Sequence, residues 1–236
     1  MTLALSTDGL CAGYGKVTVV HDLSLEVPEG STVALLGPNG AGKTSTLGAL
    51  TGTVSTTAGS VRLFGQPIDA LSTYHRAQRG LTLIPDGRGV FPGLSVGENL
   101  ELAAESAQGV DKAWRRKQLA RVDEIFPVLA GRRGQRAGTL SGGEQQMLAM
   151  SRAFLANPKV LMMDEISAGL APLIVQKLYD AVEHLKRDGT TIVLVEQYTQ
   201  YALRLADICY VMAKGSITFV GEPAELQGAG AGISYL

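Results

Sequence analysis

The sequence predicts an α/β fold with a parallel sheet, and three observations support this prediction. Four short apolar runs have the length and composition of buried strands. Helical stretches separate these runs, which indicates an α/β arrangement. The first run leads directly into a glycine-rich loop that is followed by a helical pattern. The four runs are residues 33–36, 81–84, 160–163 and 192–195.

The part of the chain before the glycine-rich loop is predicted to be rich in β-structure. Leu23, Leu25 and Val27 alternate with polar residues, which is typical of a half-buried strand. The turn Pro28-Glu29-Gly30 then leads into the strand at 33–36, as in an antiparallel meander. We therefore expect an antiparallel β subdomain beside the parallel sheet.

A helical block lies between the second and third apolar runs. Apolar residues recur there with helical spacing from about residue 99 to residue 129. The basic residues of the block more often form a solvated helix face than a nucleic-acid patch. These basic residues are Lys112, Arg115, Arg116, Lys117 and Arg121. The block therefore indicates an inserted helical subdomain.

Composition limits the classes of function. The chain has 236 residues and a formal net charge of −1, which argues against a dedicated nucleic-acid binder because such proteins usually have a basic excess. Its apolar runs are shorter than the roughly 18 residues that a membrane-spanning helix needs. The first residues also lack the basic region of a signal peptide. We therefore expect a cytoplasmic protein whose membrane role, if any, comes through a partner.

The loop after the first strand has the spacing G-x-x-x-x-G-K-[ST] of a phosphate-binding loop. Glycines let the backbone curl so that successive N–H groups point at one anion. Lys43 is placed to reach the β- and γ-phosphates, and the Thr44 hydroxyl can bind Mg²⁺. The predicted nucleotide contacts come from Gly37, Pro38, Asn39, Gly40, Ala41, Gly42, Lys43, Thr44 and the neighbouring Ser45.

A second potential anion site begins at Ser141. Ser141 and Glu144 form a capping box, so we expect a helix to start here. Its bare N–H groups, the helix dipole and two glycines, Gly142 and Gly143, suit a phosphate beside the serine hydroxyl. An ordinary capped helix is the alternative. A second site of this type in a protein with a phosphate loop favours the functional interpretation.

Two carboxylates, Asp164 and Glu165, follow the third apolar run directly. They are therefore expected at the C-terminal end of a core strand, and ligands of open α/β sheets bind at the edge formed by such strand ends. Asp164 is placed to hold Mg²⁺, directly or through water, and Glu165 to orient or deprotonate an attacking water. An Asp-Glu pair by itself is usually only a solvated strand end. After a phosphate loop and an apolar strand, it predicts a catalytic pair.

These segments, in this order and spacing, resemble the ATP-binding subunits of ABC transporters over nearly the whole chain. The most specific motif is LSGGEQQ at residues 140–146, which matches the family signature. In that family two subunits pack head to tail, so each ATP lies between the phosphate loop of one and the signature of the other. The resemblance implies that Ser141 and Gly143 contact a γ-phosphate held by a partner subunit. It also implies that Tyr14 stacks on adenine and that residues 167–170 cross the dimer interface.

The resemblance further implies a RecA-like P-loop NTPase core with an antiparallel β subdomain and an inserted helical subdomain that docks on a membrane partner. We expect a single ABC ATPase domain over residues 1–236. Its core would comprise 1–85 and 160–236, and its helical subdomain 86–159. The protein would then be cytoplasmic and peripheral on the inner face of the cell membrane.

Three positions depart from the general family pattern. The loop after residues 81–84 normally offers a glutamine to Mg²⁺ and the attacking water, whereas this chain has Asp86. Ile166 replaces the usual proline. Gln197 stands where the family usually has a histidine, and it can donate a hydrogen bond but cannot carry the imidazolium charge. Without the resemblance, Asp86 and Gln197 would be interpreted as polar loop residues. The implied catalytic residues are Glu165 and Gln197, and the implied metal ligands are Thr44, Asp86 and Asp164.

The departures narrow the resemblance to one of the two ATPases of high-affinity branched-chain amino acid importers. The segments that carry this likeness are 86–92, 96–100, 167–172 and 195–197. Such an ATPase pairs with a second, different ATPase beneath two membrane-spanning permease subunits. A solute-binding protein delivers the solute to these permease subunits. Related urea and amide importers share much of this pattern. The sequence leaves open the solute and the choice between heterodimer and homodimer.

Two other functions fit parts of the sequence. One alternative is a soluble ABC-type ATPase that acts in DNA repair, translation or cluster assembly. The repair type usually has a long coiled coil between its phosphate loop and its signature. The stretch between Lys43 and Ser141 is too short for one and has no sustained heptads. A module that senses ATP without hydrolysing it would be consistent with Asp86 and Gln197, but it has no need of Glu165. The sequence therefore favours a transport-coupled ATPase.

Overall fold

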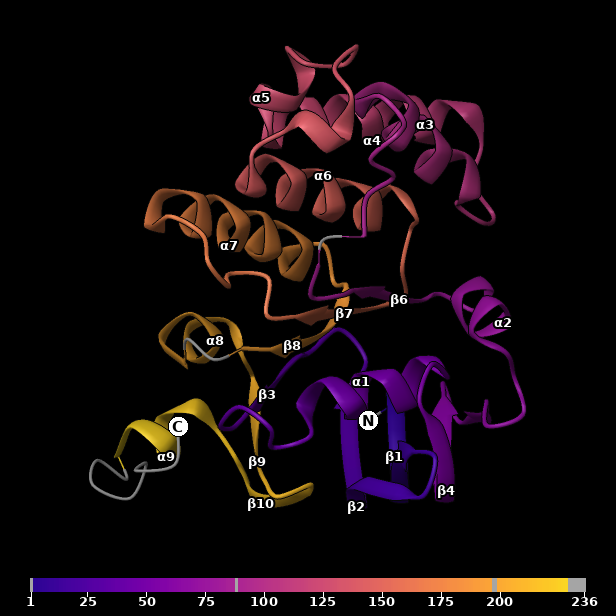
Figure 1. Cartoon of the computed structure of the whole chain (residues 1–236), viewed down its shortest axis with the longest axis vertical. Helices are drawn as coiled ribbons and strands as arrows, with labels where there is room; N and C mark the ends of the chain where they lie inside the picture. Colours follow the sequence, from indigo (N-terminus) through magenta and orange to yellow (C-terminus); the bar gives the residue numbers. More distant parts are fainter. Residues whose placement is uncertain (1, 88, 197–198, 229–236) are drawn as a thin grey trace. The chain divides into compact units, whose positions relative to one another are not determined.

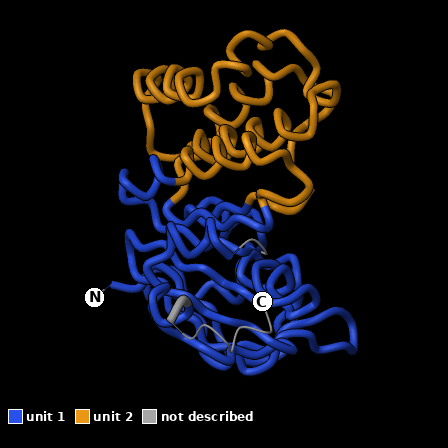
Figure 2. Tube along the Cα trace, turned by 90° about the vertical axis from the view of Figure 1, so that its left-hand side faces the viewer, with its two compact units in different colours: residues 1–83, 159–165, 183–236 blue, residues 84–158, 166–182 orange. Residues whose placement is uncertain are grey.

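The computed structural model describes residues 2–87, 89–196 and 199–228, and the chain divides into two compact units (Figure 2). The first unit comprises residues 1–83, 159–165 and 183–236. The second comprises residues 84–158 and 166–182. The expected division into a core and a helical subdomain at residues 85 and 160 stays a prediction.

The first unit is built around a six-stranded sheet of order β10-β9-β3-β8-β7-β6 (Figure 1). β3 pairs in parallel with β8 and β9, and β7 pairs in parallel with β8. Every residue of β3, β7 and β8 is buried, as expected for strands covered on both faces. The predicted α/β fold is confirmed. The strands are β3 Thr32–Leu36, β6 Leu81–Ile84, β7 Val160–Asp164, β8 Thr191–Val195, β9 Ile208–Ala213 and β10 Ser216–Gly221.

The antiparallel hairpin of β9 and β10 was not predicted from the sequence. Lys214 and Gly215 connect its strands with φ values of 48° and 83°, and positive φ at both positions is typical of a type I′ turn. The N–H of Gly215 donates to the carbonyl oxygen of Ala41 over 2.9 Å. The hairpin turn therefore supports the glycine-rich loop from a distant part of the sequence.

A second sheet in the first unit is antiparallel and has the order β2-β1-β4-β5. The side chains of Leu23, Leu25 and Val27 are buried, which confirms the alternation predicted for this strand. The expected meander is wrong, because β2 and β3 belong to different sheets. Residues 29–31 instead carry the chain from one sheet to the other. The strands are β1 Leu3–Tyr14, β2 Val17–Pro28, β4 Ser55–Leu63 and β5 Gln66–Pro67.

Helix α1, Lys43–Thr51, follows the glycine-rich loop and is buried at every residue except Thr44. Its C-terminal end is held by Arg76, which donates to the carbonyl oxygens of Ala49 and Leu50 over 2.8 Å each. These bonds satisfy carbonyl groups that a helix end leaves without partners. The other helices wholly within this unit are α2 Thr73–Gln78, α8 Thr199–Leu205 and α9 Pro223–Gly228.

The second unit is helical. Helix α6 contacts α3, α4 and α5. On α4, Lys112, Arg116 and Lys117 are exposed, which agrees with a solvated basic face. Among the described residues, the helices are all too short or too polar to cross a membrane. The helices are α3 Val96–Ser106, α4 Lys112–Ile125, α5 Pro127–Ala130, the 3₁₀ helix η1 Ala137–Thr139, α6 Gly142–Leu155 and the first part of α7 Pro172–Arg187.

Candidate active site

The predicted phosphate loop connects the end of β3 to the start of α1. Three of its glycines have positive φ, a conformation that glycine adopts more readily than other residues: 149° at Gly37, 78° at Gly40 and 103° at Gly42. At Gly37 a side chain would also collide, because an added Cβ would lie 2.3 Å from the carbonyl oxygen of Met212. The curled path of the loop therefore depends on these glycines.

The N-terminus of α1 is open to an anion. Gly42 is its N-cap, and no side chain among the described residues caps the first turn. Pro38, Asn39 and Gly40 are exposed at the tip of the loop, as is Thr44 at the start of the helix. The first N–H groups of a helix have no partner within it, and the helix dipole favours negative charge there. This end of α1 therefore suits a phosphate.

Lys43 turns back over the loop. Its Nζ donates to the carbonyl oxygens of Gly37 over 2.8 Å and of Pro38 over 3.1 Å. The same Nζ lies 3.7 Å from Glu165 Oε1, and the Lys43 side chain is only 4% exposed. A buried ammonium needs such partners, and charged phosphate oxygens would be stronger ones. The fold thus brings together Lys43 and Glu165, which the sequence predicted from separate motifs.

The two predicted carboxylates lie at the C-terminal end of β7. Asp164 is the last residue of the strand and is buried, whereas the Glu165 side chain is 22% exposed. Glu165 has a φ of 45°, which is uncommon outside glycine, and its N–H donates to the Val195 carbonyl oxygen over 2.9 Å. This conformation turns the chain directly after the strand, with the Glu165 carboxylate next to Lys43.

The oxygen donors beside the loop fit Mg²⁺. Thr44 offers an exposed hydroxyl and Asp164 a buried carboxylate, and both are the hard ligands that this ion prefers. Mg²⁺ usually takes one or two carboxylates and completes its shell with water and phosphate oxygens. It therefore does not need a cluster of three acidic, histidine or cysteine side chains, and the described part of the chain contains none.

Tyr14 and Ser45 lie next to each other beside the start of α1. The Tyr14 hydroxyl and Ser45 Oγ are 3.4 Å apart. Tyr14 is 56% exposed, whereas Ser45 is buried. An exposed aromatic ring next to a phosphate loop offers a flat apolar face on which a base can stack.

The predicted helix of the second anion site is present in the second unit. Ser141 is the N-cap of α6, and its Oγ accepts from the N–H of Glu144 over 3.4 Å. In return, Glu144 Oε2 accepts from the N–H of Ser141 over 2.9 Å. Gly143 packs closely, since an added Cβ would lie 2.8 Å from Ile174 Cγ2. Ser141 is exposed and Gly142 and Gly143 are partly exposed, so a ligand can reach them.

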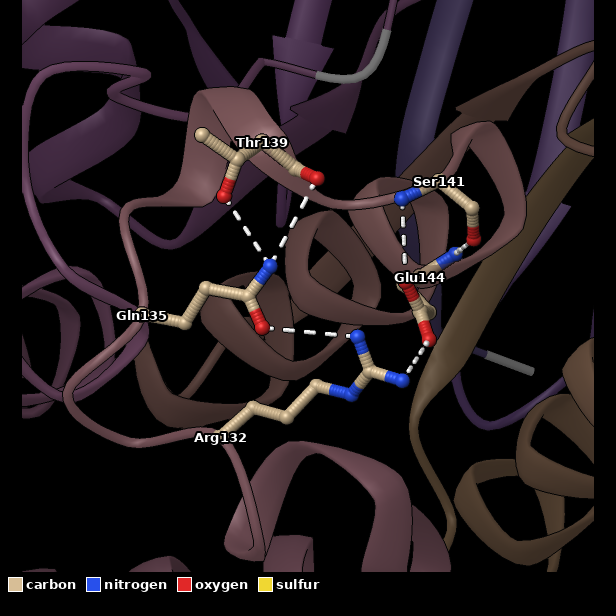
Figure 3. A network of polar contacts seen from close by, with 5 residues as sticks. All are labelled: Arg132, Gln135, Thr139, Ser141 and Glu144. Carbon is tan, nitrogen blue, oxygen red and sulfur yellow. Dashed lines mark hydrogen bonds and ion pairs between the residues drawn. The ribbon is translucent and has the colours of Figure 1, made fainter.

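A polar network supports this capping box (Figure 3). Arg132 Nη2 lies 3.2 Å from Glu144 Oε1, and Arg132 Nη1 donates to Gln135 Oε1 over 3.4 Å. The hydrogen bond from the Ser141 N–H lowers the pKa of Glu144 against an opposing effect of burial, and the Ser141 hydroxyl and Arg132 add to the lowering. Arg132 was not predicted from the sequence, because no spacing rule links it to Glu144.

The positions that depart from the family pattern have different surroundings. Asp86 is exposed in the turn after β6, whereas Ile166 is 1% exposed. Within residues 167–170, the N–H of Leu170 donates to the Ser167 carbonyl oxygen over 3.3 Å, so the segment forms a tight turn. Gln197 lies outside the described residues.

Comparisons with known proteins agree with this geometry. The family model described as ABC transporter matches residues 20–168, more than half of the chain. The high-affinity branched-chain amino acid transport ATP-binding protein BraG of Pseudomonas aeruginosa is 44% identical over 222 residues, which cover 94% of each chain. The chain belongs to the ABC transporter family. It is an ATP-binding subunit and an ATPase of this family.

Two other relatives of this ABC ATPase are named for branched-chain amino acid transport and for lipopolysaccharide export. The probable branched-chain amino acid transport ATP-binding protein LivF of Archaeoglobus fulgidus is 37% identical over 94% of this chain and 93% of its own. The lipopolysaccharide export system ATP-binding protein LptB of Escherichia coli is 32% identical over 94% and 92%. A solved ATP-binding subunit of an ABC transporter superposes with a TM-score of 0.85 at 26% identity, over 96% of this chain and 92% of that one. Subunits of this family bind ATP, dimerise and act with membrane permeases.

Proposed function

We propose that this chain hydrolyses MgATP to energise an importer for branched-chain amino acids or related small solutes. Two relatives, at 44% and 37% identity, are named for branched-chain amino acid transport, whereas LptB, at 32%, is named for lipopolysaccharide export. Asp86 and Gln197 also fit the resemblance to an importer of this type, in which an acidic residue or glutamine is common at the first position and glutamine at the second.

We propose that the chain works with membrane-spanning permease subunits and a second ATPase subunit, in a hetero- or homodimer. A solute-binding protein would deliver the solute to the permease. In this arrangement the chain is cytoplasmic and peripheral on the inner face of the membrane. Two relatives are named as ATP-binding proteins of branched-chain amino acid transport, which supports action together with separate membrane subunits.

One observation carries the hydrolytic part of the proposal. The ammonium proposed to hold the γ-phosphate and the carboxylate proposed to receive a proton from water are 3.7 Å apart, although Lys43 and Glu165 belong to different motifs. We assign Lys43 and the loop N–H groups to stabilise the charge on the transferred phosphoryl group. Glu165 would orient or deprotonate the attacking water.

The remaining residues would bind the nucleotide and its metal ion. Mg²⁺, when bound, would supply positive charge that neutralises the phosphate oxygens during transfer. Thr44 and Asp164 would hold it, with Asp86 as a further ligand, and Gln197 would donate a hydrogen bond to the γ-phosphate. Tyr14 would stack on adenine. Ser141, Gly142 and Gly143 would meet the γ-phosphate of an ATP bound by the other subunit.

Phosphate release from MgATP by the purified chain tests the hydrolytic part. Glu165→Gln keeps the shape of the side chain but removes the base, so we expect hydrolysis to fall by about 100-fold or more while ATP still binds. Glu183→Gln, which changes a surface ion pair with Arg187, is the matched control and should hydrolyse ATP at the wild-type rate. Fast turnover by the Glu165→Gln variant would remove Glu165 from its proposed role.

Uptake of labelled leucine by the transport complex in vesicles tests the solute. We expect ATP-dependent uptake of leucine in competition with isoleucine and valine. Co-purification tests the alternative of a soluble ATPase. Purification of the chain without any permease subunit would support that alternative. Transport of lipid instead of amino acid would contradict the importer.

A further inference from the structure

The second unit contains two capping boxes of the same residue types, and their glutamates are bonded differently. At the start of α3, the N–H and the hydroxyl of Ser95 both donate to Glu98 Oε2, over 2.7 Å each. At the start of α6, Glu144 divides its carboxylate between two partners. Its Oε2 accepts from the N–H of Ser141 over 2.9 Å, and its Oε1 pairs with Arg132 over 3.2 Å. The glutamate of the α6 capping box therefore forms an ion pair with Arg132 in addition to its bond to Ser141.

The charge of Glu144 opposes the proposed task of α6. The helix N-terminus carries partial positive charge that favours a phosphate. Glu144 lies in the first turn and its side chain is only 14% exposed, so water screens its charge poorly. The hydrogen bonds from Ser141 keep the pKa of Glu144 below its usual value, so the carboxylate is ionised at neutral pH. A negative charge at this position would repel the γ-phosphate unless a cation neutralised it.

Arg132 is held where it can supply that neutralisation (Figure 3). Its Nη1 donates to Gln135 Oε1 over 3.4 Å, and Gln135 Nε2 donates to Thr139 Oγ1 over 2.9 Å. The Arg132 side chain is 43% exposed, and an ion pair with one partner exposed to this degree contributes little to folding. Its main effect should therefore be on the charge that a ligand of α6 meets.

We propose that Arg132 is a positioning residue that raises the affinity of the signature segment for the γ-phosphate by neutralising Glu144 and fixing its carboxylate against Ser141. This inference rests on the proposed function, in which Ser141 and Gly143 meet an ATP bound by another subunit. Without the guanidinium, two negative charges face each other at the start of α6. ATP at the phosphate loop then closes the dimer less readily.

ATP-driven dimerisation of the Glu165→Gln chain measures this effect. Sedimentation at increasing MgATP concentration gives the concentration at which half of the chain is dimeric. Adding Arg132→Gln should raise that concentration about five-fold, the size expected for one partly screened charge. Arg132→Lys keeps the charge and should recover most of the affinity. ATP binding by the monomer and the thermal midpoint of unfolding should remain at their Glu165→Gln values.

The neighbouring residue provides a matched control. The Arg133 guanidinium pairs with Asp123 over 2.6 Å and not with Glu144. Arg133→Gln therefore removes an equal charge from the same turn and should leave ATP-driven dimerisation unchanged. If Arg132→Gln and Arg133→Gln weaken dimerisation equally, the loss comes from net charge or from the turn, and the inference is overturned.

Glu144→Gln tests the electrostatic cause. A glutamine at this position keeps the capping bond but removes the charge that Arg132 neutralises. In a chain with Glu144→Gln, Arg132→Gln should therefore change the MgATP concentration for half-dimerisation by less than about two-fold. An unchanged five-fold effect in this background would overturn the inference, even if Arg132→Gln alone destabilised the fold.

The two proposals fail in different ways. If the Glu165→Gln chain forms no dimer with MgATP, the homodimeric form of the proposed function fails and the inference falls with it. If that dimer forms but is insensitive to Arg132→Gln, the proposed function stands and only the role of Arg132 is wrong.

Discussion

Two helix N-termini of this protein are proposed to meet the same phosphate from different subunits, and they are built in opposite ways. Helix α1 starts at Gly42, with a φ of 103° and no side-chain cap among the described residues. Helix α6 starts at Ser141, whose capping box with Glu144 is closed and paired with Arg132.

The difference indicates when each end binds. At α1 the first N–H groups are left for a ligand, and Lys43 bonds to loop carbonyl oxygens that a phosphate would replace. At α6 a side chain already satisfies part of the first turn, so the gain from binding phosphate is smaller. We expect α1 to bind ATP in the single chain, and α6 to bind only when another subunit presents the ATP.

The largest effect is expected from Lys43→Ala, which removes the cation of the α1 site. Hydrolysis, measured as phosphate release, should fall by about 100-fold or more. The variant lacks the buried Lys43 ammonium that would stabilise negative charge in the transition state. Lys117→Ala changes an exposed lysine of α4 and serves as the control. A loss below ten-fold would mean that Lys43 does not hold the phosphate.

A smaller effect is expected from Gly143→Ala, which changes α6 by steric means alone. The added methyl would lie 2.8 Å from Ile174 Cγ2, and overpacking of this kind costs about 2 kcal/mol. ATP-driven dimerisation of the Glu165→Gln chain should then weaken by up to about thirty-fold, while ATP binding to the monomer is kept. Ile174→Ala should restore dimerisation.

Gly134→Ala provides the control for this steric test. An added methyl at Gly134 meets no atom of the described residues within 4 Å. This variant should dimerise like the parent chain. If Gly143→Ala also dimerises normally, close packing against Ile174 does not set the shape of the signature segment.

The smallest of the three effects is expected from Tyr14→Ala, which belongs to the α1 site. The Kd of the single chain for ATP should rise about ten-fold through loss of stacking. Tyr14→Phe keeps the ring and loses only the 3.4 Å contact with Ser45, so its Kd should stay within about two-fold. Tyr74→Ala removes a similarly exposed tyrosine and should not change the Kd.

The parallel sheet was predictable because its central strands are buried on both faces and form continuous apolar runs. Strand pairing was not. Val33 pairs with Val193 and Ile208, far along the chain, and a local pattern contains no information about such partners. A meander was therefore expected from the succession of β2 and β3 along the chain, although these strands belong to different sheets. The hairpin of β9 and β10 was missed because Lys214 occupies a left-handed position where asparagine or glycine is the usual signal.

The candidate site was predictable where its chemistry needs consecutive residues. The phosphate loop, the capping box at Ser141 and the carboxylates at 164–165 are local motifs, and the structure shows each one in the expected place. The bond between Arg132 and Glu144 depends instead on how residues 131–141 fold. Only the structure could reveal it.

The most direct test of the central claim, that the starts of α1 and α6 meet one ATP across two subunits, is hydrolysis by mixed variants. A Lys43→Ala chain keeps its signature segment, and a Ser141→Arg chain keeps its phosphate loop. In an equal mixture, heterodimers assemble one complete site from the two intact parts. We expect the mixture to release phosphate at a rate well above the sum of the rates of the two separate variants. If the wild-type chain alone releases phosphate, a mixture no more active than its components would contradict the claim.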